Sequence, residues 1–378
     1  MKFSKRSEKL TSSPLYVFFR KVKEAEAAGK KIISLGVGEP FQDTPENIKQ
    51  AGIEAIKAGK TKYNPAAGST ALRKKMAEKY QVSIEQVVTS NGAKPFLGSI
   101  FWSLVDEGEI VYLAAPVYPP FFAIAESCDA KVVLIDTKPT EFKLTLKALK
   151  EAVENNDNGK PAHLLVNSPN NPTGVVSDKE ELEKIVRFCK ENNITLISDE
   201  CYSQFSPDPS FSLRQIDPKV IVINSFSKAY GMTGWRLGYV VCPAELAVAL
   251  TRYLDNYVGC ASSISDAAAI TALDSEPLED FVEQRKIIHQ WLAEHQIPFS
   301  PSTGGIFIFP DFKPVIEKLN LSGSMELAAY FLEKAEVATT PGIAFGEAYD
   351  THLRISYSIK IEELKEALEK LDKVMIKN

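Results

Sequence analysis

The segment around Lys228 carries the residues that are most suggestive of chemistry. The run is Asn224-Ser225-Phe226-Ser227-Lys228-Ala229-Tyr230-Gly231-Met232-Thr233-Gly234-Trp235-Arg236-Leu237-Gly238, and it follows the apolar residues 220–223. A lysine amine in such surroundings suits a Schiff-base nucleophile. Ser225, Ser227 and Arg236 supply hydroxyl groups and a planar guanidinium, which match the oxygens of a phosphate. A Schiff base beside a phosphate predicts pyridoxal 5'-phosphate (PLP) as the cofactor.

Short apolar runs along the chain predict the strands that position this chemistry. They lie at residues 87–88, 110–113, 132–135, 164–166, 194–197, 220–223 and 237–241, and segments typical of helices separate the first six. This order predicts an α/β domain with a mostly parallel central sheet flanked by helices. Ligands of such sheets bind beyond the carboxyl ends of the strands. Suggestive residues follow five strands, at 91–94, 116–118, 167–174, 199 and 225–228, so we expect them to converge on one crevice.

Local signals predict where several helices begin and end. Thr44-Pro45 opens a helix that Gly59 can close, and Ser177 to Glu180 is typical of a capping box. After about residue 276 we expect helices at 278–294, 326–334 and 361–375 and strands at 304–309 and 352–359. These pieces predict a smaller α+β domain. We expect a large PLP-binding domain at residues 43–280 and a small domain built from both termini, at 1–42 and 281–378.

Composition narrows the class of protein. The 378 residues include 44 Lys and Arg against 49 Asp and Glu, which gives a net charge of -5 with no basic run, so no nucleic-acid partner is expected. No apolar stretch approaches the length of a membrane span, and the polar first residues are not typical of a signal peptide. Five cysteines and four histidines form no metal-ligand spacing, so we expect no metal. Free thiols favour a reducing compartment, and the cytoplasm is the expected location.

Six short motifs occur together along the chain. They are Gly38-Glu39-Pro40, Lys62-Tyr63-Asn64-Pro65, Asn167-Ser168-Pro169-Asn170-Asn171-Pro172-Thr173-Gly174, Ser198-Asp199-Glu200-Cys201-Tyr202, the run around Lys228, and Leu353-Arg354-Ile355-Ser356-Tyr357. In this order and spacing the chain resembles the class I/II aminotransferases, the fold type I PLP enzymes, over nearly its whole length. The resemblance implies transfer of an amino group between an L-amino acid and a 2-oxo acid through a Schiff base on Lys228.

The resemblance implies roles at the cofactor ring. PLP draws electrons into a pyridinium ring, whose nitrogen needs a nearby carboxylate, and Asp199 fits this need. By resemblance, the Tyr202 hydroxyl and the Asn171 amide bind the phenolic oxygen, so Lys228, Asp199 and Tyr202 are the expected catalytic residues. Taken alone, Asp199 fits a turn cap equally well, whereas Tyr202 would be a packing aromatic and Asn171 a turn former before Pro172.

The remaining cofactor contacts follow from the same comparison. The backbone amides of Ala93 and Lys94 open a predicted helix and would bind the phosphate together with Ser225, Ser227 and Arg236. Tyr118 matches the aromatic residue that stacks on the ring, although it is also consistent with a core aromatic. Tyr63 belongs to a segment that relatives contribute from a neighbouring subunit, which implies a homodimer.

Substrate recognition is predicted to centre on Arg354. In the alternating stretch 352–359 its position alone would favour a solvated arginine. The family places an arginine of this strand toward the cofactor, where it binds the substrate carboxylate in a bidentate manner. Gly38 and Asn171 complete the expected substrate-binding set. Lys228 would then carry the proton of the α-carbon, which requires a lowered pKa.

The sequence leaves the amino donor and some alternatives open. Lys94 stands where some relatives that act on dicarboxylic amino acids have a lysine, whereas the bulky segments 15–19 and 118–122 suit an aromatic or aliphatic side chain. A PLP-dependent lyase or oxidase acting on an amino acid is the alternative function on the same fold. A binding protein that has lost turnover is disfavoured by the intact set of Lys228, Asp199 and Arg354. The chain also lacks the glycine motif of nicotinamide dehydrogenases.

Overall fold

A seven-stranded sheet forms the centre of the larger part of the chain. The computed structural model describes residues 14–156, 159–209 and 211–375, so the expectations for residues 1–13 lie outside the described residues. Across the sheet the strands are β2 (Val87–Ser90), β8 (Gly238–Val241), β7 (Ile221–Ser225), β6 (Ile194–Asp199), β5 (Ala162–Asn167), β3 (Ile110–Ala115) and β4 (Lys131–Asp136). Every neighbouring pair is parallel except the two that involve β8. The prediction of a mostly parallel sheet is therefore confirmed.

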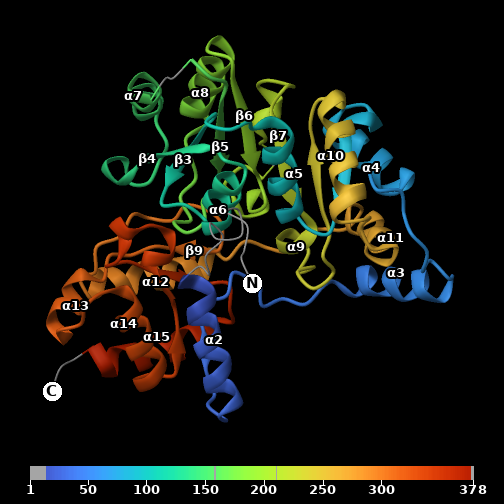
Figure 1. Ribbon diagram of the computed structural model, residues 1–378. Helices are drawn as coiled ribbons and strands as arrows, with labels where there is room; N and C mark the ends of the chain where they lie inside the picture. The colour runs from blue at the N-terminus through green and yellow to red at the C-terminus, as the bar shows by residue number, and fades with distance from the viewer. Residues whose placement is uncertain (1–13, 157–158, 210, 376–378) are drawn as a thin grey trace, which may run out of the picture.

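Helices cover both faces of this sheet, as Figure 1 shows. They are α3 (Glu46–Lys57), α4 (Thr70–Tyr80), α5 (Lys94–Leu104), α6 (Pro119–Ser127), α7 (Leu146–Asn156), α8 (Lys179–Glu191), α9 (Phe226–Ala229), α10 (Ala244–Tyr257) and α11 (Ser263–Ala272). Side chains of a strand alternate between the faces. Thus Val87 and Tyr112 belong to one buried cluster, and Val88 and Val111 belong to another. Because both faces are buried, the strands read as continuous apolar runs in the sequence.

Two small sheets organise the other part. The first pairs β1 (Ile33–Ser34) with β10 (Val337–Ala338) in parallel, and the second has the antiparallel order β11 (Thr340–Pro341), β12 (Leu353–Ser356), β9 (Phe307–Ile308). The helices around them are α2 (Pro14–Ala27), α12 (Val282–Glu294), α13 (Lys313–Leu319), α14 (Ser324–Lys334) and α15 (Ile361–Met375). Figure 1 shows the blue α2 beside the orange and red C-terminal elements.

Short 3-10 helices connect the main elements. They are η1 (Ile84–Gln86), η2 (Lys138–Thr140), η3 (Ser203–Phe205), η4 (Leu213–Gln215), η5 (Gly342–Phe345) and η6 (Glu347–Tyr349). Among the described residues, no helix is both long enough and apolar enough to traverse a lipid bilayer.

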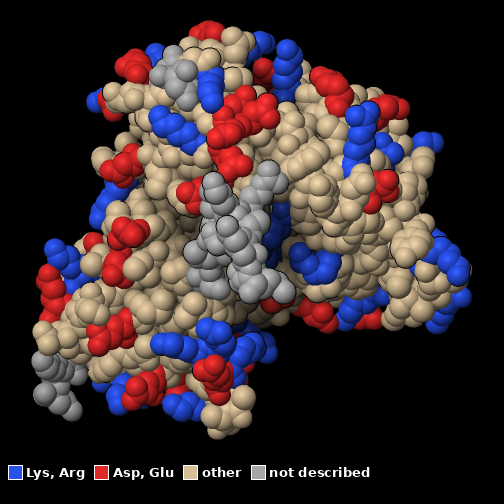
Figure 2. Space-filling view, in the orientation of Figure 1, with Lys and Arg blue, Asp and Glu red and all other residues tan. Residues whose placement is uncertain are grey.

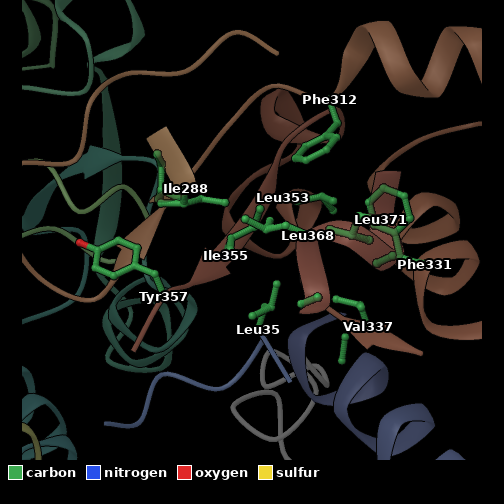
Figure 3. Close-up of a cluster of buried hydrophobic side chains, with 14 of the residues drawn as sticks. Leu35, Ile288, Phe312, Phe331, Val337, Leu353, Ile355, Tyr357, Leu368 and Leu371 are labelled. Atoms are coloured by element: carbon green, nitrogen blue, oxygen red, sulfur yellow. The ribbon is translucent and has the colours of Figure 1, made fainter. Parts of the chain in front are cut away.

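The smaller part has an apolar core of its own. Leu35 from the N-terminal segment lies with Val337, Leu353, Ile355 and Leu368, all of them buried. Figure 3 shows these side chains pointing toward one another between the β12 strand and the helices. Two distant segments of the sequence therefore share one core, and this core fixes β12 and its Arg354 in space.

Two local predictions were wrong in detail. Asp178 rather than Ser177 is the N-cap of α8, and its side chain makes no capping hydrogen bond. The Asp178 carboxylate instead pairs with Lys143, with 3.0 Å between Nζ and Oδ1. The helix expected from residue 278 begins at Val282, and the backbone N–H of Leu278 donates to the Ala229 carbonyl at 2.7 Å. Residues near both helix starts thus make contacts with distant parts of the chain.

Gly174 lies where the two parts touch and permits a test of that contact. Its φ of +69° lies in the left-handed region, and its carbonyl accepts from the N–H groups of Thr303 and Gly304, both at 3.0 Å. A Cβ atom at Gly174 would overlap the Phe307 carbonyl oxygen. Gly59, with φ +71°, has nothing within 4 Å of the position that a Cβ atom would take.

We expect Gly59→Ala to lower the free energy of unfolding by about 1–2 kcal/mol, from the left-handed backbone alone. Gly174→Ala adds the steric overlap and is expected to lower it by more than about 3 kcal/mol. Urea unfolding followed by circular dichroism measures both variants. Equal losses would show that the overlap at Gly174 relaxes without cost.

Candidate active site

The predicted site residues lie at the carboxyl ends of the parallel strands. Asp199 ends β6, Ser225 ends β7, and Asn171 follows β5 by four residues. A cavity of about 950 Å³ is lined by Glu39, Asn91, Thr233 and Arg236 among others, so it includes the guanidinium proposed for the phosphate. Figure 2 shows the molecule hollowed where its upper and lower parts meet, with basic side chains exposed beside the hollow.

Lys228 lies on the short helix α9 and reaches across to the N-terminal segment. Its Nζ donates a hydrogen bond to the carbonyl oxygen of Gly38 at 2.7 Å. Burial lowers the pKa of Lys228 to about 8, and the positive charges of Arg236 and Arg354 act in the same direction. About a tenth of the amine is therefore uncharged at pH 7, far more than for an ordinary lysine, and this is the form that attacks a carbonyl and accepts a proton.

Asp199 is a carboxylate with little solvent around it. Its side chain is 8% exposed, and Oδ1 accepts from the backbone N–H of Cys201 at 3.0 Å. Burial raises the pKa of Asp199 above its ordinary value, although the contacts with Cys201 oppose this. Within the described ranges no ion pair involves Asp199, so its charge is available to a cationic group bound in the crevice.

Two glycines leave room for Arg236 to lie close to the start of α5. A Cβ atom at Gly92 would lie 2.5 Å from Nη2 of Arg236, and one at Gly238 would lie 2.5 Å from the Ala93 nitrogen. Nη1 of Arg236 donates to the Thr233 carbonyl at 2.8 Å. The guanidinium is thus held beside the N-terminus of an 11-residue helix, where free N–H groups attract anions.

Arg354 is buried, whereas the alternating sequence pattern alone would favour a solvated arginine. It is 3% exposed, and its Nη1 donates to Oδ1 of Asn171 at 3.0 Å. Nη2 donates to the Gly36 carbonyl at 2.7 Å and to the Thr340 hydroxyl at 3.3 Å. Nε is buried without a hydrogen-bond partner among the described residues. The guanidinium therefore keeps binding capacity for an anion in the crevice.

The two tyrosines expected at the cofactor lie near these charges. Tyr202 packs against the Phe307 ring with 5.4 Å between centroids, and the guanidinium of Arg354 lies 4.3 Å from the centre of the same ring. Burial raises the pKa of Tyr118, which the charges of Lys94 and Arg354 oppose. Tyr118 therefore lies within electrostatic reach of both cations.

Of the other predicted residues, two serines lie near Lys228, whereas Tyr63 is remote from this group. Ser225 and Ser227 are both 6% exposed and lie on either side of Phe226 near Lys228. Tyr63 is 97% exposed and is not brought to the site within its own chain. The sequence did not single out Gly36, Thr340 or Phe307, which hold Arg354 from remote segments, because no local motif marks them.

The residues present fit PLP. Asp199 offers a buried carboxylate that lacks a cationic partner in the described part of the chain, as a pyridinium nitrogen requires. Arg236, Ser225, Ser227 and the start of α5 offer the donors that a phosphate requires. Lys228 offers an amine of lowered pKa between these two groups in the crevice.

The titration of Lys228 predicts a pH dependence of stability in the cofactor-free protein. The pKa is lowered to about 8 from 10.5 because burial penalises the charged form. Between about pH 8 and 10.5, the unfolded chain binds more protons at this lysine than the folded chain, so this group contributes stability that rises with pH. We expect the unfolding free energy of the wild type, minus that of Lys228→Met, to rise across this window in urea titrations. A difference that does not change with pH would contradict the lowered pKa.

Comparisons with known proteins agree over the whole chain. The family model described as aminotransferase class I and II matches residues 30–371. A probable aspartate/prephenate aminotransferase from Aquifex aeolicus is 36% identical over 395 residues, which cover 98% of each chain. An aspartate aminotransferase from Bacillus subtilis is 31% identical, with 100% of each chain covered.

Solved structures give the same result. The Thermus thermophilus aspartate aminotransferase with maleate has a TM-score of 0.89 and 29% identity, and the match covers 99% of this chain and 100% of that one. A tetra mutant of the same enzyme complexed with tryptophan has a TM-score of 0.91 with the same identity and coverage. The resemblance inferred from the motifs is thus confirmed, and the chain belongs to the class I and II aminotransferases, which are PLP-dependent transferases of fold type I.

Proposed function

We propose that the crevice residues carry out transamination with an acidic amino acid as donor. The observation that supports this most strongly is the arrangement of Lys228, Asp199 and Arg354, three charged groups at one crevice with binding capacity unused by the chain itself. The bound cofactor supplies an electron sink for the bond to the substrate α-carbon. The protein residues bind, orient and move protons around it.

The cofactor-binding set has two ends. At one end, Arg236, Ser225, Ser227 and the backbone amides of Ala93 and Lys94 bind the phosphate through charge-assisted hydrogen bonds, which contribute about 1.5–3 kcal/mol each. At the other end, the Asp199 carboxylate keeps the ring nitrogen protonated. Tyr118 would stack on the ring, and Tyr202 and Asn171 would bind its phenolic oxygen. Support comes from the burial of Asp199, Tyr202 and Asn171 and from the hydrogen bond that joins Asn171 to Arg354.

The substrate-binding set orients the α-carbon. Arg354 binds the α-carboxylate with its planar fork. Asn171 and Gly38 are hydrogen-bonded to Arg354 and Lys228 respectively. Lys228 then moves the proton from the α-carbon. Gly38 keeps the amine in place, since its carbonyl oxygen accepts from Nζ at 2.7 Å. The lowered pKa of Lys228 suits a general base near neutral pH.

Lys94 supports an acidic donor such as aspartate or glutamate. It lies at the start of α5, close to Tyr118, which in turn is within reach of Arg354. Two cations within electrostatic reach of the same tyrosine suit a substrate with two carboxylates. The relatives named as aspartate or aspartate/prephenate aminotransferases and the Thermus structure with maleate, a dicarboxylate, point the same way.

We further propose the division of the chain into a large domain at residues 43–280 and a small domain at 1–42 and 281–378. The separate sheets and the shared core of Leu35 with the C-terminal elements support it. A cytoplasmic location is supported by the five cysteines, which are all free thiols.

The catalytic assignment predicts distinct effects for two variants. Lys228→Ala is expected to abolish transamination while circular dichroism stays that of the wild type. Arg354→Lys keeps the charge but loses the planar fork, so the KM for the amino donor is expected to rise about 30-fold while the cofactor colour persists. Absorbance between about 330 and 430 nm, recorded before and after adding L-aspartate, measures cofactor state and half-reaction together. Full activity in Lys228→Ala would refute the proposal.

The proposed homodimer rests on Tyr63, whose side chain is exposed in its own chain. If it completes the partner's site, Lys228→Ala and Tyr63→Ala chains complement each other after mixing. About a quarter of wild-type activity should return, because half of the dimers are mixed and each holds one intact site. Mixed samples that stay as inactive as the separate variants would show that Tyr63 does not act across subunits.

A further inference from the structure

Tyr16 and Lys94 form a hydrogen bond that joins α2 to α5. Nζ of Lys94, at the start of α5, donates to the Tyr16 hydroxyl oxygen at 3.1 Å. Tyr16 lies on α2, 78 residues earlier in the chain, so the bond joins two elements that the sequence does not bring together. The ammonium also lies 5.9 Å from the centre of the Tyr16 ring. Tyr16 has no part in the catalytic or cofactor-binding roles proposed above.

The position of Tyr16 is fixed by its neighbours on α2. Leu15 is buried in the apolar cluster that includes Val88 and Phe96 of the large-sheet part. Phe18, two residues after Tyr16, is buried in the cluster of the C-terminal part. The first turn of α2 is therefore anchored in both parts. Tyr16 itself is 53% exposed, so core packing does not explain its hydroxyl.

A second phenol interacts with the same ammonium. Burial lowers the pKa of Lys94, whereas Tyr118 and Tyr16 raise it, and the net pKa is above its ordinary value. Tyr118 is also within electrostatic reach of Arg354 and Asp199. Lys94 is therefore linked through Tyr118 to the charges proposed for substrate and cofactor.

The hydrogen bond to Tyr16 restricts how the Lys94 ammonium is oriented. A lysine ammonium has three N–H groups in tetrahedral geometry. The hydrogen bond to the Tyr16 hydroxyl occupies one of those directions and so restricts where the other two N–H groups point. A long side chain that is already oriented loses less conformational freedom when it binds a ligand. We propose that Tyr16 is a positioning residue that aims a remaining N–H of Lys94 at the distal carboxylate of an acidic donor; this inference rests on the acidic-donor function proposed above.

Tyr16→Phe tests the inference, because it removes one oxygen atom and keeps the ring. We expect the KM for L-aspartate to rise about five-fold, with kcat little changed, since one side chain must now be ordered on binding. The KM for L-alanine, which has no distal carboxylate, is expected to rise less, so the preference for aspartate falls. Tyr330→Phe is the matched control. It loses a hydroxyl that donates to the Val374 carbonyl at 3.1 Å, remote from the site, and should leave both KM values unchanged.

Lys94→Gln separates this inference from the function on which it rests. If the wild type prefers L-aspartate and Lys94→Gln removes that preference, Lys94 binds the distal carboxylate. An unchanged preference in Tyr16→Phe would then overturn the role of Tyr16 alone, and so would an equal rise of KM for both donors. A wild type that uses L-alanine as well as L-aspartate would overturn the acidic-donor proposal together with the inference.

Discussion

Charged side chains that are buried without full internal compensation are the constraint on which the site depends. Asp199 and Arg354 are 8% and 3% exposed, yet Asp199 has no ion pair, and Nε of Arg354 has no hydrogen-bond partner, among the described residues. Burying a charge is unfavourable unless a partner is supplied. A protein that retains such groups therefore gains stability when a ligand of complementary charge binds. A ligand of complementary charge would supply the partners that Asp199 and Arg354 lack within the described chain.

The two parts of the chain contribute different kinds of residue to this crevice. The parallel sheet places Asp199 and Ser225 at adjacent strand ends, and its glycines let Arg236 approach the start of α5. The smaller part supplies Arg354 from β12, held by Gly36 and Thr340. Contacts at Gly174 join the two parts next to Asn171. Arg354, proposed to bind the substrate carboxylate, therefore belongs to the smaller part, and the residues proposed to bind the cofactor belong mostly to the larger one. The distance between them depends on how the two parts pack.

Much of this arrangement followed from the sequence, and the exceptions have physical causes. Strands buried on both faces read as apolar runs, and α15 was predicted at 361–375 because its apolar residues keep helical spacing. The alternating pattern alone would have left Arg354 in solvent, because period-two alternation distinguishes two faces but not solvent from a polar crevice. Gly36 and Thr340 could not be found, since only the folded chain brings them to Arg354. The capping box expected from Ser177 is absent: Asp178 is the N-cap of α8, and the backbone N–H of Ser177 donates to the Ser168 hydroxyl at 3.1 Å.

Recognition of the donor, as proposed, adds a contact from α2 to the elements that carry the chemistry. The residues proposed for proton transfer and cofactor binding lie mostly between positions 91 and 236, on strand ends whose geometry the sheet fixes. Lys94, whose side chain is proposed to bind the distal carboxylate, lies in the same stretch, but the direction of this side chain depends on a phenol from α2. Because α2 places Leu15 in one apolar cluster and Phe18 in the other, its position depends on both parts of the chain. Tyr16 itself is 53% exposed and belongs to neither buried cluster. A change at Tyr16 is therefore expected to alter donor preference more than the chemistry at the strand ends.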